Sequence, residues 1–246
     1  MNFIKNHPFP VEAYFTESVV LTFAVPKKHL QPFLPDCLTL DTFQDKYAFI
    51  AVAMVQTTGL RPQGMPAFLG NDFFLIGYRI FVRYRNIAGK NLRGLYILKS
   101  ETDKKKMEIL GNIFTHYKYT TTDIEQEKRG DLKIIHSKKS GFKVAFFDKN
   151  QENIPLPQTS VFADWKEARR FAGPLPHSFS YNAADNTMLI IQGLRQNWTP
   201  KPIKVIKSDF TFLDKLDLPD LLLANAFQIK NVPYRWKKGK IEKLSA

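Results

Sequence analysis

The stretch Phe73-Phe-Leu-Ile-Gly-Tyr-Arg-Ile-Phe-Val-Arg-Tyr-Arg85 alternates between two kinds of side chain. Apolar residues from Phe74 to Tyr84 occupy every second position, and Arg79, Arg83 and Arg85 occupy positions between them. A period of two residues is that of a β-strand, because successive side chains point to opposite faces. We therefore predict a long strand with one covered face and one solvated face that carries the arginines.

Similar β-rich segments precede and follow this strand, and few segments have helical character. Strands are expected at residues 18–25, 47–55, 93–101, 112–121, 132–136, 142–147, 188–192, 203–208 and 227–230. Helices are expected at residues 27–33, 103–110, 161–172 and 221–226, and a long loop at 57–72. The fold class is therefore α+β and mainly β. A closed or nearly closed β-barrel with a few peripheral helices would leave the fewest open strand edges.

Composition bounds the kind of protein. The 246 residues include a single cysteine, Cys37, so no disulfide framework or cysteine-based zinc site is expected. No apolar run is long enough for a membrane helix, and the N-terminal residues lack the pattern of a signal peptide. We expect a cytoplasmic protein with one domain over residues 1–246. Its barrel core would span about 14–236, and a basic tail at 237–246 would lie on the surface with little to bury.

The net charge is +13, from 36 Lys and Arg against 23 Asp and Glu. A basic balance can indicate nucleic acid or a pocket for small carboxylates. The basic residues are spread along the chain, and no nucleic-acid-binding motif occurs, so nucleic acid is the less favoured partner. The exception is the cluster from Arg235 to Lys243, which leaves open a basic surface protein with a macromolecular partner.

Several segments together resemble one family. They include Leu60-Arg-Pro-Gln-Gly-Met-Pro66, Gly94-Leu-Tyr-Ile-Leu-Lys-Ser-Glu-Thr-Asp103 and Gly111-Asn-Ile-Phe-Thr-His-Tyr117. The chain resembles the uncharacterised, YqjF-like DUF2071 family, which belongs to the acetoacetate decarboxylase-like superfamily. The resemblance covers most of residues 14–236. It implies the barrel fold of that superfamily and a pocket inside it.

The resemblance also implies which residues stand at the reactive positions. Acetoacetate decarboxylases use a lysine amine as the nucleophile that forms a Schiff base. A second cation next to this lysine lowers its pKa. The corresponding segment here is Thr115-His116-Tyr117-Lys118. Tyr117 replaces the nucleophilic lysine, and Lys118 matches the helper lysine. A phenol cannot form an imine, so decarboxylation of acetoacetate is not expected.

Other positions carried over from the family are only partly matched. Asp103 matches a pocket glutamate, whereas Ile80 and Ala24 stand where a second glutamate and an arginine would be. Within a strand over 112–121, Tyr117 would face the barrel interior, and His116 and Lys118 would face away.

Each candidate pocket residue has a structural alternative. Tyr117 could be a core tyrosine, and Asp103 could cap the helix that follows it. Arg61, in the expected loop, could clamp a carboxylate or order the loop by a salt bridge or carbonyl contacts. Glu101 and Lys99 lie two apart on one strand face, where a solvated ion pair is favoured over an acid/base pair.

The remaining motifs give no support to other chemistry. The histidines lack metal-ligand spacing, no serine-hydrolase or phosphate-loop motif occurs, and no cofactor is expected. We expect a barrel that binds a small organic carboxylate or carbonyl compound. An active lyase that uses Lys118 or another lysine stays open, as does a homo-oligomeric state.

Overall fold

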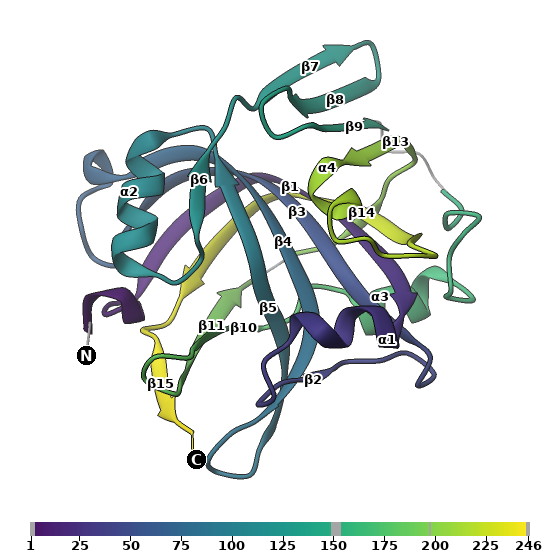
Figure 1. Ribbon diagram of the computed structural model, residues 1–246. Helices are drawn as coiled ribbons and strands as arrows, with labels where there is room; N and C mark the ends of the chain where they lie inside the picture. Colours follow the sequence, from purple (N-terminus) through teal and green to yellow (C-terminus); the bar gives the residue numbers. More distant parts are fainter. Residues whose placement is uncertain (1–2, 149–153, 197, 245–246) are drawn as a thin grey trace.

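The computed structural model describes residues 3–148, 154–196 and 198–244. The chain is mainly β, as predicted, and forms one large curved sheet and one small sheet (Figure 1). The outermost residues of the expected domain 1–246 and the last two of its tail lie outside the described part.

The large sheet contains the long strands. Its strands are β1 Val11–Pro26, β2 Thr39–Leu40, β3 Tyr47–Pro62, β4 Asn71–Arg85, β5 Asn91–Thr102, β6 Tyr119–Thr121, β10 His177–Asn182, β11 Thr187–Arg195, β12 Lys201–Pro202, β14 Leu222–Trp236 and β15 Lys240–Lys243. Neighbouring strands follow the order β14-β1-β3-β4-β5-β10-β11, and β11 pairs again with β14. The strands thus form a closed ring, most of it antiparallel.

The closing pair depends on a glycine. Gly193 of β11 lies opposite Trp236 of β14, and Arg195 lies opposite Tyr234. A Cβ atom at Gly193 would lie 2.0 Å from the Tyr234 hydroxyl oxygen, closer than any real contact allows. Only glycine therefore lets β11 approach β14 closely enough to pair while Tyr234 keeps its position.

The small sheet packs on one face of the large sheet (Figure 1). It consists of β7 Glu125–Arg129, β8 Leu132–Ser137, β9 Phe142–Phe147 and β13 Val205–Phe210. Its buried residues Ile135 and Val144 belong to the same apolar cluster as Val52 and Met54 of β3. The two sheets therefore share a hydrophobic core.

The helices are short and peripheral to the sheets. They are α1 Lys27–Leu30, α2 Lys105–Phe114, α3 Trp165–Ala172 and α4 Thr211–Asp214, with 3₁₀ turns η1 Phe3–Asn6, η2 Gln31–Phe33 and η3 Ala67–Leu69. Among the described residues, none of them has the length and apolarity that a membrane-spanning helix needs.

Helix α3 begins later than predicted. It packs on the face of the large sheet opposite to the small sheet. Asp164 caps it by accepting a hydrogen bond from the Glu167 backbone N–H at 2.7 Å. Its buried residues Ala168 and Ala172 pack in one cluster with Phe49 and Phe81. This face of β3 and β4 is the one that lines the ring's cavity, so the expectation of a helix outside the barrel is wrong.

Three other sequence assignments also need correction. Half of the expected loop at 57–72 is strand, because β3 runs to Pro62 and β4 begins at Asn71. The expected strand at 112–121 is only Tyr119–Thr121, because α2 continues to Phe114 and a turn follows. The expected helical piece at 221–226 belongs to strand β14. In each case pairing with a neighbouring strand or continuation of a helix overrides the local pattern.

The arginine face of β4 is not solvated as predicted. Arg83 and Arg93 each pair with the fully buried carboxylate of Asp41, at 2.7 and 2.5 Å. Of the three arginines on β4, only Arg85 is exposed. Arg79 points into a cavity, described below. The arginine face of this strand is therefore covered at Arg79 and open to solvent toward Arg83 and Arg85.

The C-terminal segment is docked, which contradicts the prediction of a surface tail. Strand β15 pairs with β11, and the Glu242 side chain is 1% exposed. Its carboxylate accepts hydrogen bonds from the Tyr84 hydroxyl at 2.8 Å and from the Ile87 backbone N–H at 3.0 Å. Lys240 pairs with the same carboxylate at 2.7 Å. Burial raises the pKa of Glu242, but these donors outweigh it and the net shift is downward from 4.5.

Glu242→Gln should therefore destabilise the protein by about 1–3 kcal/mol at pH 7, because an amide cannot accept from all these donors. Glu242 has a lowered folded-state pKa, so its stabilisation is present above the ordinary pKa and is lost as pH falls through the folded-state pKa. The difference between wild type and variant should shrink below about pH 4.5. Urea unfolding at several pH values measures this. Lys243→Gln, at an exposed position of the same strand, is the control; equal losses in both variants would contradict the docking role.

Candidate functional site

A cavity of about 150 Å³ lies inside the strand ring. Each ring strand contributes to its wall: Phe15, Ser18 and Val20 of β1; Ala51, Ala53 and Val55 of β3; Leu75 and Arg79 of β4; Leu95 of β5; Ser178 of β10; Arg195 of β11; Phe227, Ile229, Val232, Tyr234 and Trp236 of β14. Tyr117 and Tyr119 close one side, and residues 172–175 at the C-terminal end of α3 close another. A wall built from every strand of the ring means that the ring encloses the cavity.

Small side chains create this space. The inward positions of β3 include Ala51 and Ala53, whereas Val52 and Met54 on the opposite face fill the core shared with the small sheet. Ala53 lies opposite Gly77 of β4 in the register of the two strands. A leucine-sized residue at these positions would fill the cavity, so the sequence itself specifies the room.

Arg79 occupies part of the room that Gly77 leaves. A Cβ atom at Gly77 would lie 2.8 Å from Nη2 and 3.0 Å from Cζ of Arg79, so the guanidinium folds over this glycine. Nε of Arg79 is buried and has no hydrogen-bond partner among the described residues. A buried donor without a partner costs free energy unless a ligand satisfies it. Arg79 is therefore the strongest indication of a binding site.

Arg195 brings a second guanidinium to the cavity. It donates hydrogen bonds to the backbone carbonyls of Pro174 and Leu175 and lies 3.4 Å from the Tyr234 hydroxyl. Its guanidinium carbon lies 4.8 Å from the ring centre of Trp198, in a cation–π contact. These contacts fix its position without neutralising its charge.

No acidic or lysine side chain is found among the described residues that line the cavity. Within residues 3–148, 154–196 and 198–244, neither Arg79 nor Arg195 forms an ion pair with a carboxylate of the chain. The cavity therefore carries two positive charges and offers no nucleophilic amine. Planar guanidinium groups suit carboxylates, which they bind through paired N–H donors.

Tyr117 lines the cavity and adds a buried phenol. Its hydroxyl has no partner in good hydrogen-bonding geometry among the described residues. Burial raises the pKa of Tyr117 to about 12, against the opposing effects of the Ser178 hydroxyl and the Arg79 guanidinium. At neutral pH the phenol is protonated and can donate a hydrogen bond to a carbonyl or carboxylate oxygen.

Tyr117 and Lys118 point in the expected directions, but not for the expected reason. Tyr117 lines the cavity, and Lys118 is exposed. The two residues lie in a turn between α2 and β6, where Lys118 has a left-handed backbone with φ of 53°. His116 lies on the same outer side as Lys118, half-buried, and its Nε2 is 3.3 Å from the Asn6 side-chain oxygen. The functional role of these residues stays a prediction.

Arg61 and Asp103 do not line this cavity. Arg61 pairs with Glu12 at 2.7 Å and donates to the carbonyls of Met65 and Gly59, which is the ordering role named as its alternative. Asp103 accepts a hydrogen bond from the Phe74 backbone N–H at 2.7 Å and does not cap α2. Both side chains thus hold β-strand ends in place.

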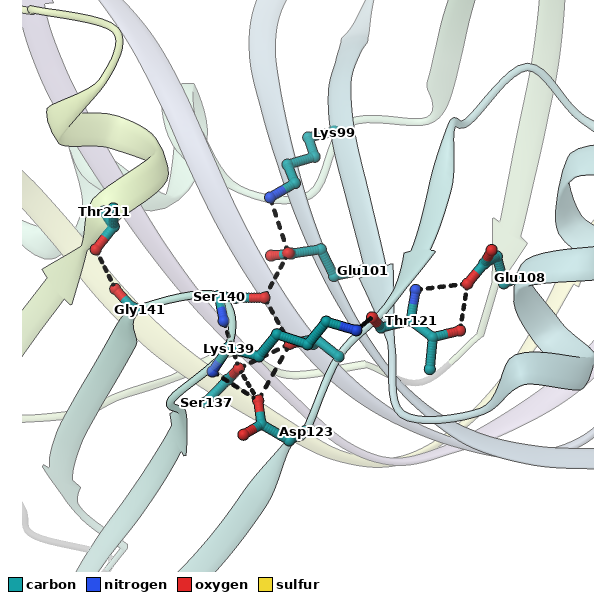
Figure 2. Close-up of polar contacts among 11 residues, drawn as sticks. Lys99, Glu101, Glu108, Thr121, Asp123, Ser137, Lys139, Ser140, Gly141 and Thr211 are labelled. Carbon is teal, nitrogen blue, oxygen red and sulfur yellow. Dashed lines mark hydrogen bonds and ion pairs between the residues drawn. The ribbon is translucent and has the colours of Figure 1, made fainter.

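Glu101 is buried rather than in a solvated ion pair, contrary to the favoured interpretation. It is 3% exposed, pairs with Lys99 at 2.8 Å, and accepts a hydrogen bond from the Ser140 hydroxyl at 2.6 Å. Ser140 also lies 2.6 Å from the Thr122 hydroxyl. Figure 2 shows this network, which continues through Ser137 to Asp123. It joins β5 to the turn between β8 and β9 and so anchors the small sheet.

Ser140→Ala should lower the free energy of unfolding by about 1–3 kcal/mol, because it removes a donor to a buried carboxylate. Thermal and urea unfolding measure the loss, and Thr120→Ala at an exposed position of β6 provides the control. An unfolding free energy equal to that of the wild type would show that the network does not anchor the small sheet.

Arg79→Met should leave the ligand-free protein as stable as the wild type or more stable, by up to about 2 kcal/mol. Methionine keeps similar length and removes a cationic group whose buried Nε has no partner among the described residues. Arg85→Met, on the same strand but exposed, should change stability by less than about 0.5 kcal/mol. Urea unfolding of the three proteins decides; a clear loss in Arg79→Met alone would show that Arg79 is structural.

Apart from Tyr117, sequence reasoning missed the polar residues of the cavity. Arg79 was assigned to solvent because it alternates with apolar residues, and Arg195 and Ser178 carried no signal in their segments. Gly77, two positions before Arg79 on the same face, was the available sign that the guanidinium has room inside.

A family model for DUF2071, an uncharacterized conserved protein, matches residues 12–239. The uncharacterized protein YqjF of Bacillus subtilis (strain 168) is 28% identical over 132 residues. This match covers 53% of the chain and 52% of YqjF, so the aligned part spans about half of that relative.

Solved structures share the fold at low sequence identity. Acetoacetate decarboxylase from Legionella pneumophila superposes with a TM-score of 0.64 at 12% identity, covering 96% of this chain and 88% of that one. An acetoacetate decarboxylase-like enzyme from Sphingomonas wittichii RW1 gives 0.59 at 10% identity, with coverage of 98% and 94%. The enduracididine biosynthesis enzyme MppR, complexed with pyruvate, gives 0.55 at 9% identity, with coverage of 95% and 90%.

Proposed function

The chain belongs to the DUF2071 family, and we propose that it binds a small organic carboxylate inside its strand ring. The observation that carries this proposal is the buried Nε of Arg79, which has no hydrogen-bond partner among the described residues and belongs to a cavity without an acidic side chain in its described lining. An arginine in that setting lacks its natural counter-ion, and a carboxylate ligand would supply both the charge and the hydrogen-bond acceptors.

Each polar group of the cavity would contact a different part of the ligand. Arg79 receives the carboxylate, and Arg195 contributes a second positive charge that its backbone contacts hold in place. The protonated phenol of Tyr117 and the hydroxyl of Ser178 can hydrogen-bond to a carbonyl or hydroxyl group next to the carboxylate. The apolar remainder of the wall keeps water out and strengthens these electrostatic contacts.

The structural neighbours support a small acid as the ligand class. Among them are acetoacetate decarboxylase itself and MppR in complex with pyruvate. At such low sequence identity, the structural likeness supports a shared fold rather than a shared chemistry. The ring in this chain takes the role of the acetoacetate decarboxylase-like barrel, with the ligand inside it.

A lysine-dependent lyase is the alternative, and the geometry disfavours it. Lys118 is exposed and on the outer side of its turn, and no lysine lines the cavity among the described residues. Schiff-base chemistry on a ligand in the cavity needs a lysine amine that reaches that ligand, and the described lining offers none. Binding without Schiff-base chemistry is therefore the function we favour.

Isothermal titration calorimetry with pyruvate, acetoacetate and acetate tests the proposal. The wild type should bind at least one of these acids, and Arg79→Met and Arg195→Met should each weaken binding about tenfold or more. Arg85→Met should bind like the wild type. Borohydride treatment in the presence of acetoacetate, followed by mass spectrometry, should give no adduct.

Two results would overturn the proposal. One is a borohydride-trapped adduct on a lysine, which would establish the lyase alternative. The other is affinity for these acids that is the same in the wild type, Arg79→Met and Arg195→Met.

A further inference from the structure

A second cavity adjoins the first. It has a volume of about 160 Å³ and lies between the N-terminal segment, the start of β4 and helix α2. The two cavities share five wall residues: Phe15, Leu75, Tyr117, Tyr119 and Trp236. These shared residues form a common wall between the two cavities.

The second cavity differs from the first in charge. Its wall is mostly aliphatic and aromatic, including Phe73, Met107, Leu110 and Phe114. The cation at its edge, Arg61, is paired with Glu12 at 2.7 Å. His7, also in the wall, is 6% exposed, and burial lowers its pKa, so it is neutral at pH 7. This end of the combined space therefore offers no uncompensated charge.

From these two cavities we infer that the ligand is an amphipathic acid, with its carboxylate at Arg79 and Arg195 and an apolar tail that reaches the second cavity. This inference rests on the proposed function and specifies its ligand class. A cavity of about 150 Å³ lined by apolar side chains accommodates a group the size of benzene. The two volumes together suit a medium-length aliphatic acid or an aryl-substituted acid rather than a two- or three-carbon acid alone.

The tail would pass the shared wall near Tyr117. Tyr117 and Tyr119 lie with ring centres 6.1 Å apart, and Phe15 packs on Tyr234 at 4.6 Å and on Trp236 at 5.7 Å. Aromatic faces accept an aliphatic or aryl chain without a desolvation cost for polar groups. The hydroxyl of Tyr117 stays with the head group, and its ring can line the path of the tail.

The test uses a series of straight-chain acids, from acetate through butyrate, hexanoate and octanoate to decanoate, each below its critical micelle concentration. In the wild type, affinity should rise about fourfold for each added methylene once the head cavity is filled, because each methylene is buried. Octylamine, with the same chain and the opposite charge, should not bind.

Leu110→Trp tests where the tail lies. Leu110 lines the second cavity and not the first, so a larger side chain there should remove the gain beyond butyrate and leave butyrate affinity unchanged. Ile109→Trp is the matched control, because Ile109 neighbours Leu110 on α2 and is 52% exposed. It should reproduce the wild-type series.

The outcomes separate this inference from the proposed function. Short acids that bind with dependence on Arg79, with affinity that stays flat as the chain grows, would overturn the inference and leave the proposed function standing. Octylamine binding as tightly as octanoate, or octanoate binding unaffected by Arg79→Met, would overturn both. The wild-type chain-length series decides even if Leu110→Trp does not fold.

Discussion

Both faces of the large sheet are buried, and this constraint governs the rest of the structure. One face packs on the small sheet, and the other surrounds the cavity or meets α3. Carboxylates that are buried on or beside these strands need partners inside the protein. Asp41 forms ion pairs with two arginines. Glu101 pairs with Lys99 and accepts a hydrogen bond from Ser140. Glu242 pairs with Lys240 and accepts hydrogen bonds from Tyr84 and Ile87. These polar contacts tie loops, the small sheet and the C-terminal strand to the ring.

Arg79 differs from these groups, because it has no ion-pair partner among the described residues and its buried Nε makes no hydrogen bond there. The departure is built into the sequence, since Ala53 and Gly77 provide the space into which the guanidinium folds. Larger residues at these positions would pack the ring better and leave no space inside it for the charged guanidinium. Proteins commonly give up stability in this way at the places where they bind ligands.

Sequence reasoning predicted much of the fold, because alternation and β-branched runs mark long strands well. It placed the strand at 73–85 within two residues of β4, and the family resemblance agreed with the structural neighbours. It failed where tertiary pairing decides. Residues 57–62 carry glycine and polar residues typical of a loop, yet continue β3. Nor could a period of two tell which face of β4 meets solvent, so Arg79 was placed outside. The basic composition of the tail gave no sign that Glu242 is buried, because its partners Tyr84 and Ile87 are remote in sequence.

The ring joins the two ends of the chain, and this has a consequence for how it assembles. β1 pairs with β14 along most of its length, and the Glu17–Gln228 hydrogen bond links residues 211 positions apart. Such non-local pairing slows folding, because the chain loses the entropy of closing a long loop before the stabilising contacts form. During synthesis, β1 can pair with β3 early but must wait for the last strands before its other edge is covered. The exposed edge of β1 is then the place where an unfinished chain is most open to pairing with a neighbouring copy.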